Sequence, residues 1–254
     1  MKLRNSPLVM VLAQVRFAPV LKMADYVPAI QEKLRRNGYP RFGSQKIREI
    51  ALGPQPEVRQ AQRWLFANKE NNESVVLSND FIVLETSRYT VFEDFAKHLE
   101  TVLGVIGEET DLSLVHRLGL RFVDLILPED DESLDEYIKP QLHGLQADDL
   151  AVDELLNQFE SRGQTREGQL VVRLHQNNKG AFLPPDLGST HLAFASSPQK
   201  DVLATLLDID HFSEQDRDYD VPALINAMWE LHVYTGKAFN SSVTDKALEC
   251  WGKE

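Results

Sequence analysis

The sequence predicts an α+β protein made of two tandem halves, each with the order strand, helix, about four strands, long helix. Three observations predict it. A long apolar strand pattern opens each half, at residues 8–17 and 114–127. A strongly amphipathic helical pattern closes each half, and short alternating segments lie between. We therefore expect a curved antiparallel sheet with the long helices on one face, and halves spanning residues 1–112 and 113–254.

The first half opens with a strand and a helix. Residues 8–17 are rich in Val and apolar on both faces, which is typical of a central strand. Asp25 is a suitable N-cap for the following helix, and Pro28 is tolerated in a first helical turn. Gly38 and Pro40 then end the helix.

Strands and a second helix complete this half. Thr90 and Glu93 have the spacing of a capping box. Apolar residues then recur at spacings of three and four from Phe92 to Ile106, and Gly107 follows them. This pattern predicts the clearest helix of the chain. The preceding strands are predicted at residues 46–52, 58–67, 74–78 and 81–86.

The second half repeats this order. After the strand at 114–127, Ser133 and Glu136 form a second capping-box pattern, and Pro140 should bend or shorten the helix that they begin. Asp220 is the expected N-cap of the last long helix. The remaining elements are predicted strands at 156–160, 169–176, 191–195 and 202–212, and a short helix at 244–251.

The opening strands of the two halves share a short sequence echo. Leu120-Arg121-Phe122 repeats the pattern of Val15-Arg16-Phe17, which favours an internal duplication. If the two strands pair, the halves form one continuous saddle. This element order resembles the fold of the TATA-box-binding protein and of related helix-grip proteins, a likeness of topology that carries no function.

The same segments carry a family resemblance. Pro7-Leu8-Val9 through Val15-Arg16-Phe17, Leu118-Gly119-Leu120-Arg121-Phe122 and Leu207-Asp208-Ile209-Asp210 resemble a sporadically distributed bacterial family of about this length with no assigned function. The resemblance implies a cytoplasmic bacterial protein with an accessory role. It implies no reaction, cofactor or catalytic residue.

Composition and charge exclude several classes of protein. The 254 residues include 43% hydrophobic and 26% charged residues, which are globular proportions. A single cysteine excludes a disulfide framework, and no apolar stretch near the N-terminus approaches the ~20 residues of a membrane span. The net charge is −12, with +8 over residues 1–63 and −20 over residues 64–254. The acidic total disfavours non-specific nucleic-acid binding, although the basic segment remains a candidate anion-binding face.

No standard catalytic or nucleotide-binding motif occurs. The chain lacks a P-loop, GxGxxG, GxSxG, HExxH and CxxC, so we expect no cofactor. Asp208 and Asp210 would project from one face of a strand, where two carboxylates can share a divalent cation. A solvated strand edge explains the same residues, so we expect no metal there.

Arginines provide the candidate binding residues. Arg16 faces away from Val15 and Phe17, and Arg117 and Arg121 share one face of their strand. If the opening strands are neighbours, the three gather on one side of the sheet and could clamp a carboxylate or phosphate. Internal ion pairs with Asp124, Glu85 or another acid are the structural alternative. The basic segment adds further candidates: Lys33, Arg35 and Arg36.

These observations favour a non-catalytic binding protein that engages another protein. The alternative is recognition of an anion or nucleic acid by the arginine-bearing sheet face, and a third is an enzyme that holds a small molecule between sheet and helix.

Overall fold

The computed structural model describes residues 3–51, 57–128, 132–145, 147–153, 155–177, 180, 182–187, 190–194 and 204–252. The first half contains β1 (Leu8–Phe17), α1 (Met23–Arg36), β2 (Arg41–Ala51), β3 (Glu57–Ala67), β4 (Glu73–Leu77), β5 (Phe81–Thr86) and α2 (Phe92–Thr110). The second contains β6 (Leu114–Ile126), η1 (Leu134–Glu136), η2 (Pro140–Leu142), α3 (Ala147–Leu150), β7 (Gln158–Gln164), β8 (Gln169–Asn177), η3 (Pro185–Leu187), β9 (Ala204–Ser213), β10 (Arg217–Asp218), α4 (Val221–Ser242) and α5 (Asp245–Cys250).

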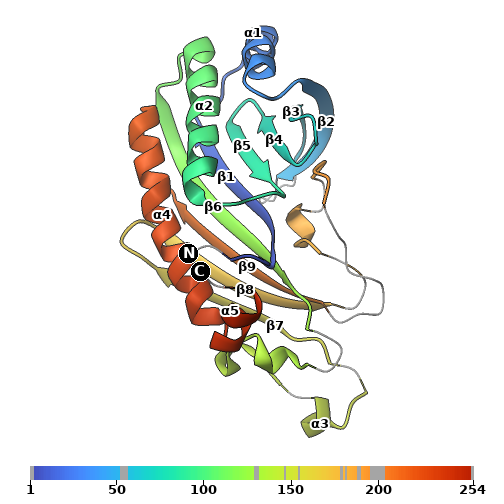
Figure 1. Ribbon diagram of the computed structural model, residues 1–254. Helices are drawn as coiled ribbons and strands as arrows, with labels where there is room; N and C mark the ends of the chain where they lie inside the picture. Colours follow the sequence, from blue (N-terminus) through green and yellow to red (C-terminus); the bar gives the residue numbers. More distant parts are fainter. Residues whose placement is uncertain are drawn as a thin grey trace.

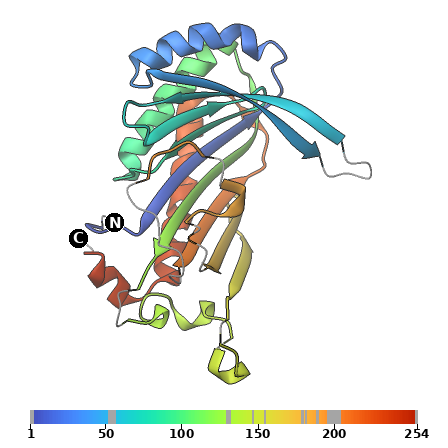
Figure 2. The ribbon, with the colours of Figure 1, turned by 90° about the vertical axis from the view of Figure 1, so that its right-hand side faces the viewer.

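These strands form one antiparallel sheet of ten strands, which confirms the α+β prediction. The order is β2-β3-β4-β5-β1-β6-β9-β8-β7, and β10 adds a short pairing to β6. Figure 1 shows β1 and β6 side by side at the centre, and Figure 2 shows β2 and β3 extending beyond the other strands.

The central pair joins the two halves. Val11 lies opposite Phe122 and Ala13 opposite Leu120, so the opening strands of both halves are hydrogen-bonded neighbours. β5 then pairs with the free side of β1, and β9 with the free side of β6. Each opening strand is thus central, as its apolar sequence predicted.

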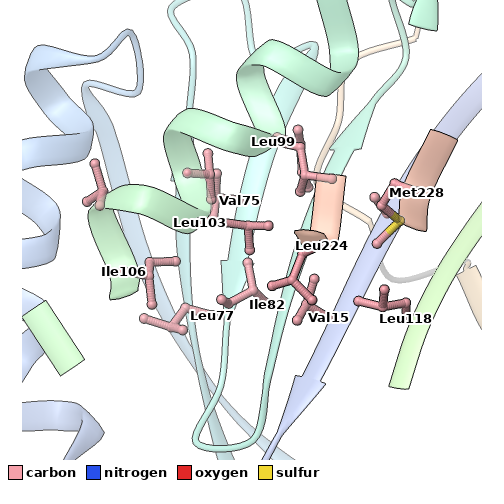
Figure 3. Close-up of a cluster of buried hydrophobic side chains, with 14 of the residues drawn as sticks. Val15, Val75, Leu77, Ile82, Leu99, Leu103, Ile106, Leu118, Leu224 and Met228 are labelled. Atoms are coloured by element: carbon pink, nitrogen blue, oxygen red, sulfur yellow. The ribbon is translucent and has the colours of Figure 1, made fainter. Parts of the chain in front are cut away.

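Helices α1, α2 and α4 cover one face of the sheet (Figure 1). The main hydrophobic core lies between them and the strands. Leu103 of α2 and Leu224 of α4 are fully buried there, together with Val15 of β1 and Leu118 of β6 (Figure 3). Because this core takes side chains from residues before and after position 112, the two halves share their apolar interior. Burial of each such leucine contributes about 1.5–3 kcal/mol.

Two helix starts differ from the sequence prediction. α1 begins at Met23 after Lys22, so Asp25 lies inside its first turn and Pro28 lies deeper than expected. α2 begins after Val91 without a side-chain cap, and Thr90 instead donates a hydrogen bond to Asp94 (3.5 Å). Asp25 and Asp94 still lie in the first turns of α1 and α2, where the helix dipole favours a negative charge.

The second half differs more. The capping-box bond from Ser133 N–H to Glu136 is present (3.3 Å), but the helix is only the three-residue η1, and Pro140 opens η2. Of the strand predicted at 191–195, residues 191–194 form no strand. Four residues of predicted strands lie outside the described residues: residue 195, residue 52 of the strand at 46–52, and residues 202 and 203 of the strand at 202–212. Asp220 does cap α4, and Thr244 caps α5.

In the described part of the chain, we find no helix that combines the length and the apolar character needed to cross a membrane.

Candidate functional site

The face of the sheet opposite the helices carries a cavity of about 590 Å³, here called the open-face cavity. Its floor is formed by strands β1 to β6 and β9, and the segment made of residues 182–187 and 190–194 lies over one side of it. Leu183 and Leu192 of this segment pack on Met10, Val123 and Leu206 of the sheet. The segment is therefore a roof that is held by apolar contacts on the sheet rather than by strand pairing.

Strand alternation places the three predicted arginines together in the lining. Arg16 of β1 lies directly opposite Arg117 of β6, and Arg121 follows on the same face. Gly119 lies between the two β6 arginines, and a Cβ there would come 2.7 Å from Nη1 of Arg117. The glycine thus leaves room for the guanidinium of Arg117 over the strand.

Arg121 is held by two carboxylates. Its Nε and Nη2 donate to Asp208 (2.7 and 2.8 Å), and its Nη1 donates to Asp186 of the roof (2.6 Å). Arg173 of β8 also donates to Asp208 (3.1 Å). Burial opposes the charge of Arg121, but the hydrogen bonds to Asp208 and Asp186 outweigh it and raise the guanidinium pKa. Arg121 therefore fastens the roof to the sheet.

These contacts correct the expected ion-pair partners. Arg121 pairs with neither Asp124, which lies on the helix side of β6 with Phe122, nor Glu85. Glu85 instead accepts hydrogen bonds from Ser74 (2.8 Å) and Thr190 (3.0 Å). The internal pairing that the sequence left open is present, but with Asp208 and Asp186.

Asp208 and Asp210 do share one face of β9, but arginines surround them. The carboxylate of Asp208 is fully buried between Arg121 and Arg173, and that of Asp210 lies 4.0 Å from Arg117. No group of three His, Cys, Asp or Glu side chains among the described residues could hold a metal ion. The two carboxylates are therefore counter-ions of the arginine cluster.

Arg117 lies in the lining without a close carboxylate partner among the described residues, the nearest ion pair being that with Asp210 at 4.0 Å. Its side chain is 20% exposed, donates to Gln14 (2.6 Å) and lies over the Phe212 ring (4.5 Å). Burial lowers its pKa, and Arg16 and Arg121 add to this, against the opposing effect of Asp210 and Glu214. Arg16 is half exposed and donates to Asp80 (3.1 Å). Two like charges opposite each other on paired strands destabilise the sheet, and an anion between them would reverse this effect.

Burial also acts on two carboxyl groups of the lining. It raises the pKa of Glu85, against the hydrogen bonds from Ser74 and Thr190, and it raises that of Asp210 despite the neighbouring arginines.

The structure does not bring Lys33, Arg35 and Arg36 into this site. All three lie on α1, on the helix-covered side. Lys33 pairs with Glu108 (2.9 Å) and Glu109, and the two arginines both pair with Glu32. The hydrogen bonds from Arg35 and Arg36 lower the pKa of Glu32 to about 2. These basic residues are surface ion pairs of one helix region.

The sequence prediction missed the contribution of the roof. It named Glu85 of β5 as a candidate partner of the arginines, and Glu85 does lie beside Leu12 on the open face, in alternation with Phe81 and Val83. Asp186 and Thr190 had no such signal, because the roof follows no periodic pattern.

No family model matches this chain, and the search of curated proteins found no match. The resemblance to the unassigned bacterial family therefore remains an expectation.

Proposed function

We propose that this protein is a non-catalytic binding protein that holds a small anion, a carboxylate or a phosphate, in the open-face cavity. The main observation behind this proposal is that Arg16 and Arg117 lie opposite each other on the two central strands, and that the charge of Arg117 is incompletely balanced. Guanidinium groups bind both kinds of anion through two parallel hydrogen bonds.

The cavity favours a small anion over a nucleic acid. The roof lies over one side of a site of about 590 Å³, and the chain as a whole carries a charge of −12, which repels a long phosphate backbone. A labelled single-stranded oligonucleotide that binds and is released by salt would favour the nucleic-acid alternative instead.

The test compares two kinds of variant by isothermal titration calorimetry with inorganic phosphate and with succinate. Arg117→Gln removes the charge, and Gly119→Ala keeps the charge but displaces the guanidinium. We expect both to weaken anion binding at least tenfold. Arg35→Gln is the matched control, because it removes an arginine outside the cavity. Equal binding by all variants, or no binding of either anion by the wild type, contradicts the proposal.

A protein partner is the second candidate function. The segment from η2 to β7 exposes several large apolar side chains, including Leu145 (63%) and Leu150 (47%). Exposed apolar groups close together in a chain are typical of a contact surface. Affinity purification of the wild-type protein should recover one partner protein in a fixed ratio, and the double variant Leu145→Ser/Leu150→Ser should no longer recover it. Recovery of the same partner by the wild type and by the variant contradicts a role for this segment.

The two-half organisation and the cellular location belong to this proposal as well. An internal duplication that forms a saddle is supported by the matching order β1-β5 and β6-β9 outward from the centre. A cytoplasmic location is supported by the single cysteine, because proteins of oxidising compartments are commonly richer in disulfides.

A further inference from the structure

A second cavity, here called the helix-side cavity, lies on the opposite face of the sheet and has a volume of about 670 Å³. Its floor is Phe122 and Asp124 of β6 with Ile209 of β9. One wall is α4, from His232 to Asn240, and the other is the start of α2 with Tyr89 before it. The N-terminal residues Leu3 to Leu8 contribute to its rim.

Asp124 is the unusual residue of this cavity. It is 3% exposed, and its carboxyl group has no hydrogen bond or ion pair with any residue that the structure describes. Burying a carboxylate without a partner costs several kcal/mol. A buried, unpartnered carboxyl that lines an open cavity is therefore a group that a ligand can satisfy.

Aromatic rings surround the space beside it. His232 stacks on Phe92 with 4.1 Å between ring centroids, and Tyr89 meets Phe122 edge to face at 5.7 Å. Burial lowers the pKa of His232 to about 4, so this ring is neutral at pH 7 and supplies no charge to Asp124. A carboxylate beside aromatic faces is the environment that stabilises an organic ammonium group.

Gly236 of α4 keeps this wall of the cavity open. It lines the helix-side cavity, and a Cβ built on it would meet no atom of the described residues within 4 Å. A larger side chain at this position would therefore occupy the cavity.

We propose that the helix-side cavity binds a protonated amine with an apolar or aromatic body, and that the carboxylate of Asp124 is its counter-ion. Among the described residues, the charged and titratable groups around Asp124 are Asp208 across the sheet, Glu93 and Tyr89 near the start of α2, His232 on α4 and Arg4 on the rim. The positive charge of the N-terminal amino group also acts on His232 and adds to the lowering of its pKa.

Binding of an amine is coupled to a proton on Asp124. Burial, with a smaller effect of Asp208, raises the pKa of Asp124 to about 8. At pH 6 the carboxyl is therefore protonated, and an ammonium group must displace that proton to bind. Affinity should rise about tenfold per pH unit between pH 6 and pH 7, and level off above pH 8.

The first experiment is a titration of the wild-type protein with tryptamine and with tryptophol, which replaces the ammonium group by a hydroxyl. We expect tryptamine to bind at least tenfold more tightly at pH 8, with the pH dependence given above. Tryptophol should show no such dependence. Equal affinities, a flat pH profile for tryptamine, or no tryptamine binding at 1 mM overturn the proposal.

Variants then locate the site. Asp124→Asn keeps the shape of the side chain and should weaken tryptamine binding at least tenfold, with tryptophol unchanged. Gly236→Leu fills the cavity and should abolish tryptamine binding. Gly104→Leu is its control, because Gly104 also lies in a helix with open space around it but does not line the cavity. Arg117→Gln should leave tryptamine binding intact, which separates this proposal from the anion site. Tryptamine binding that survives Gly236→Leu contradicts the assignment.

Discussion

Replacing Asp208 by alanine removes the carboxylate that Arg121 and Arg173 share. In the folded protein this group accepts three hydrogen bonds from the two guanidinium groups, at 2.7, 2.8 and 3.1 Å, and it is fully buried. The substitution therefore leaves Arg121, itself only 8% exposed, without its main counter-ion.

The expected loss of stability follows from these contacts. Removing one partner of a buried ion pair costs ~3–5 kcal/mol. Arg121 keeps Asp186, whose side chain is 64% exposed, so the cost should lie near the lower end, at about 3 kcal/mol. For a chain of 254 residues this corresponds to a fall in melting temperature of ~6–12 °C.

Urea denaturation followed by circular dichroism measures the change in the free energy of unfolding. Glu160→Ala is the matched control, because Glu160 pairs with Arg173 and Arg162 (2.7 and 2.6 Å) at the surface, where ion pairs contribute little. Its transition midpoint should not shift measurably. An Asp208→Ala protein as stable as the wild type would refute the view that the ion pairs of Asp208 with Arg121 and Arg173 stabilise the open face of the sheet.

Three further predictions concern stability. Leu103→Ala should lower the free energy of unfolding, measured by urea denaturation, by ~2–5 kcal/mol, because Leu103 is fully buried. Leu21→Ala is its control, because this side chain is 90% exposed and its loss should leave the midpoint unchanged. Asp220→Ala should cost ~1 kcal/mol in the same assay, because the carboxylate caps α4 through the N–H of Ala223 (2.8 Å), and an unchanged midpoint would show that the cap contributes nothing. Burial lowers the pKa of His232 to about 4, so between pH 6.5 and pH 4 only the unfolded chain takes up a proton at this residue. The wild type should therefore lose at most about 3 kcal/mol of stability as the pH falls through this window, and His232→Gln should not show this loss. Parallel pH profiles of the two proteins would contradict this prediction.

The parts of the fold that follow a local period were predictable from the sequence. α2 and α4 repeat apolar residues at helical spacing, and the helix-facing residues from Val11 to Phe17 in β1 and from Leu118 to Phe122 in β6 are apolar because they line the main core. The same alternation placed Arg16, Arg117 and Arg121 in one lining, since only their facing and the pairing of two strands were needed.

The parts that depend on contacts between distant residues were not predictable. The predicted strand at 191–195 has apolar alternation, yet Leu192 uses it to pack on the sheet face as a roof, and the N–H of Ala193 donates to Asn71 outside the sheet ladder (2.7 Å). The pairing of Arg121 with Asp186 joins residues that are 65 positions apart. No local pattern encodes such a pairing, because it depends on how the roof crosses the sheet.

The central pairing of β1 with β6 has a consequence for how the chain reaches its native state. β1 is synthesised about a hundred residues before β6, so its partner across the centre of the sheet is absent while the first half is being made. Until then an apolar strand has an unpaired edge, and unpaired apolar edges associate with other chains. A fragment that ends before β6 should therefore aggregate or dimerise through β1, and folding should be slow for a protein of this size because its central contacts are distant in sequence.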